Sequence, residues 1–262
     1  MAQPAVSERL GEGGSSAAIR AVTPAALALA AVGWWWSARM ADDMAGSGST
    51  GMDAMGATMA VGFLAFLVAW AAMMTAMMSP AVAPMVKLYG RAAAAGRVAP
   101  LPFFAAGYLV VWTSMGVPAY AAWQALMDPI VAARPWTGQL AGAVLIAAAA
   151  WQLTPFKAAC LRHCRSPISF FLRFGGKVTR PAGALRMGAM HGAFCVGCCW
   201  ALMAVLVAVG TMNLAWMAAL ALLIYVEKNA SFGERAVTLV APVLVALGVV
   251  LLVRPETLTT LT

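Results

Sequence analysis

The sequence predicts an all-α protein, a polytopic bundle of about seven transmembrane helices with its N-terminus inside and its C-terminus outside. Three observations support this fold class. First, 63 % of the 262 residues are hydrophobic and only 10 % are charged, whereas soluble domains are closer to half apolar and a quarter charged. Second, the chain repeats apolar runs of about the twenty residues that a helix needs to cross a bilayer. Third, its basic residues concentrate in alternate connections between these runs.

The predicted spans are separated by segments in which glycine, proline, serine or charge breaks the apolar pattern. These interruptions cover residues 41–58, 80–100, 127–135 and 155–187. The sixth run is the shortest of the set. The runs lie near residues 21–38, 59–79, 101–123, 137–154, 189–209, 212–226 and 236–253.

The chain accordingly divides into four parts. A flexible tail (1–20) precedes the first span and a Met-, Gly- and Asp-rich outer loop (21–58), and a helical membrane domain (59–254) is followed by a short C-terminal tail (255–262). A cleavable signal peptide is the alternative for the first span. However, the segment before that span is long and contains two glutamates, which is unusual for a signal peptide.

The distribution of basic residues orients the bundle, because lysine and arginine are retained on the cytoplasmic side. When seven spans are threaded alternately, 14 of the 17 basic residues fall on one face, together with the N-terminus. The net charge of +8 is therefore explained by cytoplasmic loops and lipid contact rather than by nucleic-acid binding. The 14 residues are Arg9, Arg20, Lys87, Arg91, Arg97, Lys157, Arg162, Arg165, Arg173, Lys177, Arg180, Arg186, Lys228 and Arg235.

The second predicted span contains four methionines in the stretch WAAMMTAMMSP. Met73 and Met77 are one helical turn apart, as are Met74 and Met78, so two thioether pairs lie side by side. Thioethers suit Cu(I) and offer little to hard cations. The alternative is that these methionines fill irregular gaps in a helix bundle.

The fifth span contains a histidine and three cysteines in HGAFCVGCCW. The helical period places Cys195 and Cys198 on the same face as His191, with Cys199 about 80° round the helix. Three thiols and an imidazole could therefore face one pocket and serve as metal ligands or redox groups. Packing of small buried side chains is the alternative for any single cysteine.

A second group of sulfur and imidazole side chains follows the fourth span in TPFKAACLRHCRSP. Cys160, His163 and Cys164 have i, i+3, i+4 spacing and share a face if the segment is helical. They represent half of a structural zinc site at most. The alternatives are an inert juxtamembrane turn whose basic residues bind lipid head groups, or a docking point for a metal carrier.

Topology places all three groups near the inner face, where thiols remain reduced. Further polar candidates lie in or beside the sixth span. Glu227 and Lys228 are either interfacial anchors or partners of a neighbouring helix, including a proton-accepting role for the carboxylate, and Asn213 could bridge helices.

Several of these segments resemble a bacterial family of predicted metal-binding integral membrane proteins. The family is described as a domain of unknown function and sometimes as a copper chaperone. The resemblance runs from about Trp70 to Val253 and is carried by WAAMMTAMMSP, WQLTPFKAACLRHCRSP, GAMHGAFCVGCCWALM, GTMNLAWMAAL and the Glu227-Lys228 pair. It implies a multi-pass protein of the bacterial inner membrane with a metal-binding function.

Three functions are compatible with these features. The first is binding of a soft ion, Cu(I) in preference to zinc, for transfer, transport or delivery to a carrier or acceptor protein. The second is a membrane redox protein that exchanges electrons between its thiols and a quinone or partner thiol. The third is a non-catalytic assembly subunit of a larger complex. No phosphate-binding loop is present, so an ATP-driven pump is not expected. The sequence favours binding over catalysis and is compatible with an oligomer.

Overall fold

The computed structural model describes residues 28, 31–35, 39, 59–131, 134–209 and 214–258. Within these ranges the regular structure is helical and contains no strand, which confirms the all-α class. Two short 3-10 turns, Gly175–Lys177 and Pro255–Thr257, accompany the longer helices. The helices from residue 59 onward are α3 (Met59–Ala94), α4 (Leu101–Ser114), α5 (Gly116–Val131), α6 (Pro135–Gln152), α7 (Pro155–Arg165), α8 (Pro167–Phe174), α9 (Pro181–Val209), α10 (Leu214–Asn229) and α11 (Gly233–Val253).

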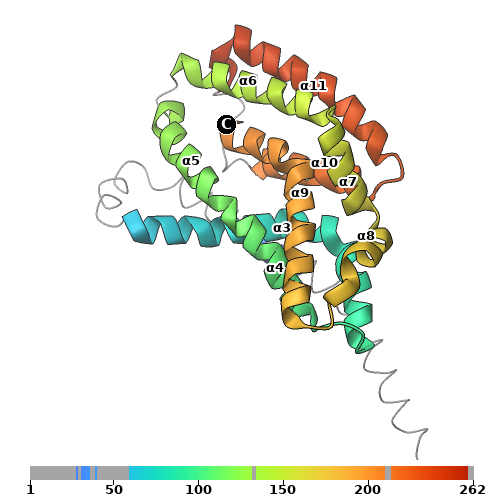
Figure 1. Ribbon diagram of the computed structural model, residues 1–262. Helices are drawn as coiled ribbons and strands as arrows, with labels where there is room; N and C mark the ends of the chain where they lie inside the picture. The colour runs from blue at the N-terminus through green and yellow to red at the C-terminus, as the bar shows by residue number, and fades with distance from the viewer. Residues whose placement is uncertain are drawn as a thin grey trace, which may run out of the picture.

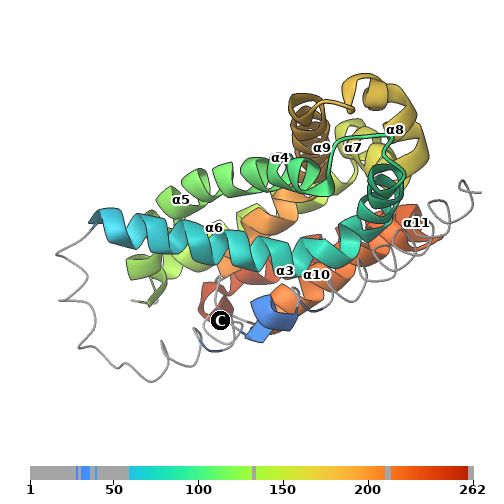
Figure 2. The same ribbon diagram turned by 90° about the horizontal axis from the view of Figure 1, so that it is seen from below.

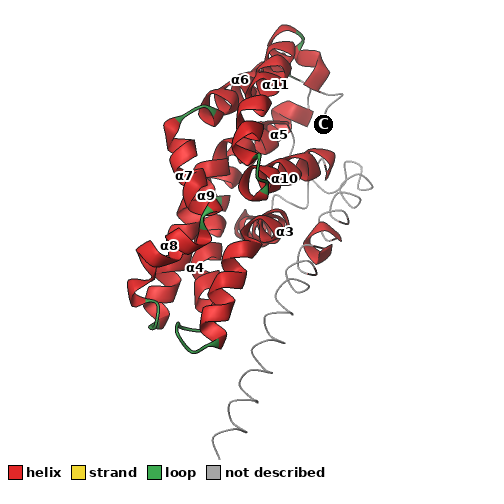
Figure 3. Ribbon diagram, turned by 90° about the vertical axis from the view of Figure 1, so that its right-hand side faces the viewer, coloured by secondary structure: helices red, strands yellow, loops and turns green. Residues whose placement is uncertain are grey.

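Helix α9 lies at the centre of the bundle (Figure 1) and contacts helices on several sides of it. It packs along α4 on one side and against α6 and α7 on the other. Helices α6 and α11 lie side by side at the end opposite α8, as Figure 3 also shows. The view from below in Figure 2 shows the long α3 running beside α10, which it contacts. The cysteines of α9 are therefore surrounded by helices from several parts of the chain.

Glycines allow the closest of these helix pairs to approach. A Cβ atom on Gly188 of α9 would collide with the backbone of Phe104 in α4, and one on Gly107 of α4 would collide with the backbone of Leu185. Gly142 and Gly248 allow α6 and α11 to approach in the same way. A Cβ on Gly142 would lie 2.6 Å from the carbonyl oxygen of Gly248, and a Cβ on Gly248 would lie 2.8 Å from that of Gly142. Small residues at such crossings are typical of membrane helix packing.

Two predicted interruptions are wrong in their extent. Helix α3 continues through Pro80 and Pro84 to Ala94 instead of ending at residue 79. A proline removes the backbone bond to the carbonyl oxygen four residues earlier, and a helix packed among others can continue through such a break. A neighbouring helix does reach this stretch of α3, because the Asn229 side chain donates to the carbonyl oxygen of Ala81 at 3.3 Å.

The second incorrect interruption is 155–187, which is largely helical. It contains α7, α8 and the first two turns of α9. Thr154 accepts a hydrogen bond from the backbone N–H of Lys157 at 3.2 Å and so caps the start of α7, with Pro155 in the first turn. This combination of an N-cap and an N-terminal proline begins a new helix directly after α6 ends.

Four described helical segments are long and apolar enough to cross a membrane: 62–94, 101–126, 181–209 and 233–253. A fifth results if 136–152 and 155–165, which meet at a bend of 67°, form one broken span. These segments are consistent with a multi-pass membrane protein. Helix α10 has 16 residues and corresponds to the short sixth run. The first predicted span and the Met-rich outer loop lie mostly outside the described residues, so the predicted count of seven stays a prediction.

Candidate functional site

The three cysteines of α9 are buried at the centre of the bundle. Cys195, Cys198 and Cys199 are each 1 % exposed. The thiols of Cys198 and Cys199 donate to the backbone carbonyl oxygen of Cys195, at 3.1 and 2.9 Å. These bonds fix both side chains against their own helix. All three cysteines of the fifth predicted span are therefore in the buried core.

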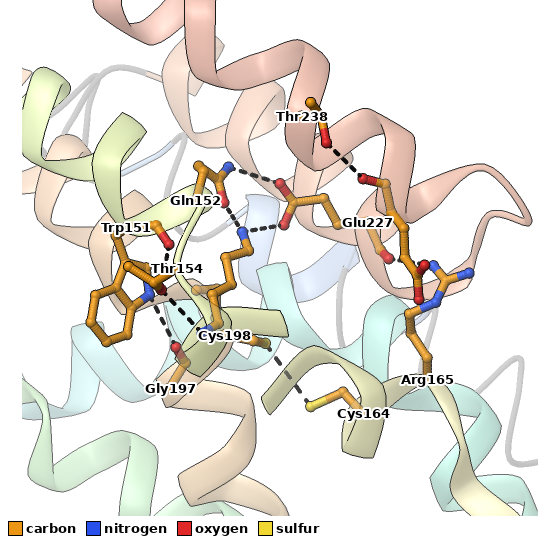
Figure 4. Close-up of polar contacts among 12 residues, drawn as sticks. Trp151, Gln152, Thr154, Cys164, Arg165, Gly197, Cys198, Glu227 and Thr238 are labelled. Carbon is orange, nitrogen blue, oxygen red and sulfur yellow. Dashed lines mark hydrogen bonds and ion pairs between the residues drawn. The ribbon is translucent and has the colours of Figure 1, made fainter. Parts of the chain in front are cut away.

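Helix α7 brings a fourth thiol to this group. The bend between α6 and α7 directs α7 across α9 (Figure 1), and Cys164 near its end lies opposite Cys198 with the two sulfur atoms 4.0 Å apart (Figure 4). Two cysteines that are 34 residues apart in sequence thus face each other across a helix contact.

Cys160, one turn earlier in α7, occupies a different position. Its sulfur lies against Gly197, where an added Cβ would be 2.8 Å from it. Gly197 therefore leaves the space that Cys160 fills, and its carbonyl oxygen accepts a bond from the Trp151 indole at 3.2 Å. The side chain of Cys160 is partly buried against the same core as the other cysteines. Its contact with backbone indicates a packing role.

Cys195 has two polar partners that the sequence patterns did not single out together. The Lys228 ammonium group on α10 donates to the Cys195 sulfur at 2.9 Å. The Tyr108 hydroxyl on α4 lies 3.2 Å from the same sulfur. Lys228 is thus turned toward the thiols and is buried, which contradicts its interpretation as an interfacial anchor.

The two histidines are held by aromatic rings. His163 stacks on Phe194 with ring centroids 4.3 Å apart and an interplanar angle of 4°, and its Nδ1 lies 2.8 Å from the carbonyl oxygen of Ala159. His191 is buried between aromatic side chains, the nearest being Phe170 at 5.1 Å. Its Nδ1 has no hydrogen-bond partner among the described residues. The structure therefore orients both imidazoles by aromatic packing rather than by the sulfur atoms.

The methionines of α3 belong to the same buried core as the cysteines of α9. Met74, Met77 and Met78 are buried in one apolar cluster with all three thiols, and Met73 packs against that cluster from a partly buried position. Sulfur side chains from α3, α7 and α9 thus share one core. The thioethers and the thiols are thus buried in the same apolar cluster.

A buried ion pair lies on the other side of α10's last turn. Glu227 accepts from Lys157 at 2.7 Å and from the Gln152 amide at 2.9 Å, and Lys157 also donates to the Gln152 side chain. Figure 4 shows the Gln152 and Glu227 side chains turned toward each other. Arg165 donates to the backbone carbonyl oxygen of Glu227 at 2.5 Å. Glu227 therefore holds α7 near both of its ends, and it is a helix partner instead of an interfacial anchor.

Sequence reasoning missed Lys157, Gln152 and Tyr108. One signal was present: Gln152 and Lys157 lie in the QLTPFK segment, where two polar side chains flank a helix break that follows an apolar run. Tyr108 occurs inside an apolar span and carries no pattern of its own. Asn213, a predicted bridging residue, lies outside the described residues.

The donor set fits an ion held by two sulfurs. Over the described ranges, no three side chains of histidine, cysteine, aspartate or glutamate are placed to hold one ion together. A metal–thiolate bond is about 2.3 Å long, so two thiolates on one ion lie about 3.8 Å apart in a tetrahedral arrangement and about 4.6 Å apart in a linear one. The Cys164–Cys198 separation of 4.0 Å lies within this range. Soft thiolate donors in this number suit Cu(I) better than Zn(II), which takes four ligands in its structural sites.

Comparison with known proteins agrees with this donor chemistry. A family model described as PpoB2, copper chaperone, matches residues 67–251. No curated protein and no solved structure matches the chain. The matched region contains the methionines of α3, the cysteines of α7 and α9, and the Glu227-Lys228 pair. Because the match covers well over half of the sequence, the chain belongs to the copper chaperone family PpoB2.

Proposed function

We propose that this protein is an integral membrane protein that binds Cu(I) between Cys164 and Cys198 and delivers it to a partner. The observation that carries the proposal is the 4.0 Å separation of these two sulfurs across the α7–α9 contact. The family description supports copper as the cargo. Binding replaces two thiol protons by the ion, so copper affinity rises with pH through the thiol range.

The methionines provide the route to this pair. Met73, Met74, Met77 and Met78 follow α3 through the core that contains the thiols. Thioethers bind Cu(I) without losing a proton and more weakly than thiolates, which suits transient binding along a path. Copper delivered along α3 would thus end at the thiolates, where it is held more tightly.

Membrane integration is supported by the outer faces of the helices. Large apolar side chains are exposed on several of them, among them Val68, Val110, Leu222 and Leu239. Exposed apolar side chains on several helices suit lipid as the solvent. With the basic connections on the cytoplasmic side of a bacterial inner membrane, α7 and the copper-binding pair lie toward the reducing compartment.

Metal analysis of protein purified without oxygen tests the proposal. Wild-type protein loaded with Cu(I) should retain stoichiometric copper after desalting. Cys164→Ser and Cys198→Ser should lose most of it, because one thiolate remains in each. Cys160→Ser is the matched control in α7 and should retain copper, because its sulfur packs against Gly197.

The redox alternative predicts a different result in the same experiment. The two facing thiols could also exchange electrons with a partner by forming a disulfide. Metal-free wild-type protein in which Cys164 and Cys198 titrate as a dithiol would favour that function and overturn copper binding. Wild-type protein with neither copper nor a titrating dithiol would favour an assembly subunit.

A further inference from the structure

Lys228 is a buried cation beside the thiols. Its side chain is 7 % exposed and its ammonium group donates to the Cys195 sulfur at 2.9 Å. The other buried lysine, Lys157, is paired with the Glu227 carboxylate. Among the described side chains no carboxylate forms an ion pair with Lys228. A buried cation is costly unless a negative charge balances it.

The proposed copper pair provides that negative charge. Two thiols that bind one ion release two protons to solvent, and the ligands then carry two negative charges. With a monovalent ion the pair has a net charge of −1, and the Lys228 ammonium brings the total to zero. With a divalent ion the pair is neutral, and the ammonium remains uncompensated in the core. No electron transfer is involved in either case.

We infer that Lys228 determines the specificity of this pocket, acting as the counter-charge that favours a monovalent soft ion over a divalent one. The inference rests on the proposed two-sulfur copper site and adds a residue that does not bind the ion itself. Cys195 accepts from Lys228 and lies one helical turn before Cys198, whose thiol donates to the Cys195 carbonyl oxygen at 3.1 Å. The positive charge therefore acts on the pair from about one helical turn away.

The size of the effect follows from the separation of the charges. Acting over roughly one helical turn, about 5–6 Å, at an effective dielectric constant of about 20, a unit positive charge strengthens binding of a singly negative complex by about 100-fold. A neutral complex gains nothing from the same charge. Removal of the charge should therefore lower affinity for a monovalent ion by about 100-fold and leave affinity for a divalent ion nearly unchanged.

The test compares monovalent and divalent affinities in purified full-length protein. Lys228→Gln removes the charge and keeps a hydrogen-bond donor, Lys228→Met removes both, and Lys228→Arg keeps both. Affinities for Cu(I), for Ag(I) as a redox-inert monovalent probe, and for Zn(II) are measured by competition with chelators. Unfolding temperature and elution profile identify which variants retain the fold.

Lys228→Gln and Lys228→Met should lose affinity for Cu(I) and Ag(I), while their Zn(II) affinity stays within a few-fold of wild type. Lys228→Arg should retain the preference for monovalent ions. Unchanged monovalent preference in folded Lys228→Gln overturns the inference and leaves the copper site intact. A parallel loss of affinity for all three ions also overturns it, because it indicates a structural role. If the wild type binds no Cu(I) or Ag(I), both the inference and the proposed function are wrong.

Discussion

The buried pair between Lys157 and Glu227 provides a quantitative test of how α7 is held. Both side chains are almost inaccessible, at 1 % and 2 % exposure, and their charged atoms are 2.7 Å apart. Glu227→Gln preserves shape and removes the carboxylate charge, which leaves the Lys157 ammonium uncompensated. Breaking a buried pair from one side costs about 3–5 kcal/mol, whereas replacing both charges by uncharged groups is often close to neutral.

We therefore expect Glu227→Gln and Lys157→Met each to lower the free energy of unfolding by about 3–5 kcal/mol, and the double variant to recover most of that loss. Unfolding in detergent micelles measures the free energies, and the four proteins form a double-mutant cycle. The rate of Cys164 alkylation reports whether α7 has loosened, and it should rise in both single variants.

A double variant that is as unstable as the two single variants added together would refute this reasoning. Such additivity would mean that the two residues act independently and that the close ion pair does not position α7. Arg165→Gln is an informative companion, because Arg165 donates to the backbone carbonyl oxygen of Glu227 and this contact is independent of the carboxylate. Its effect should add to that of Glu227→Gln in the alkylation assay.

Three further outcomes are expected. The double variant Met74→Leu with Met78→Leu should preserve the fold, because the volumes are similar, and should weaken Cu(I) binding several-fold. The control Met85→Leu, in the separate core cluster, should have no effect on binding. Equal Cu(I) affinities of the double variant and the control in chelator competition would rule out the thioether route. Gly188→Ala should destabilise the protein by about 1–3 kcal/mol in thermal unfolding, because the new Cβ disrupts the α4–α9 contact. The control Gly62→Ala should not, because no atom lies within 4 Å of its new Cβ. Equal stability of the two variants would contradict the close crossing of α4 and α9. In intact cells the cysteines of α7 should react with a membrane-permeant alkylating reagent and not with an impermeant one, and labelling by the latter would reverse the predicted orientation.

Composition and apolar runs predict the helices well, because a helix long and apolar enough to cross a membrane leaves a strong signal in its segment. The short run near 212–226 corresponds to the 16-residue α10. Helix ends are predicted less well. Pro80 and Pro84 are ordinary helix-ending signals, yet α3 continues through both, because a helix packed among others can tolerate prolines that would end an isolated one.

The candidate site is predictable only where one helix carries it. The spacing of Cys195 and Cys198 is enough to place both on one side of α9. The same rule places His163 with Cys160 and Cys164, yet its ring stacks on Phe194, a residue of another helix that no local pattern reveals. Similarly, the partner of Glu227 is 70 residues away in sequence, and its identity depends on the angle at which α7 leaves α6.

Glu227 and Lys228 are consecutive residues that contact different helices. Glu227 accepts from Lys157 in α7, and Lys228 donates to the Cys195 sulfur in α9. Neighbouring side chains on an α-helix project about 100° apart, so both contacts are set by the same rotation of α10. Inserting a single alanine upstream in α10 would swing carboxylate and ammonium away from their partners together. The Glu227 and Lys228 contacts are therefore expected to form or be lost together.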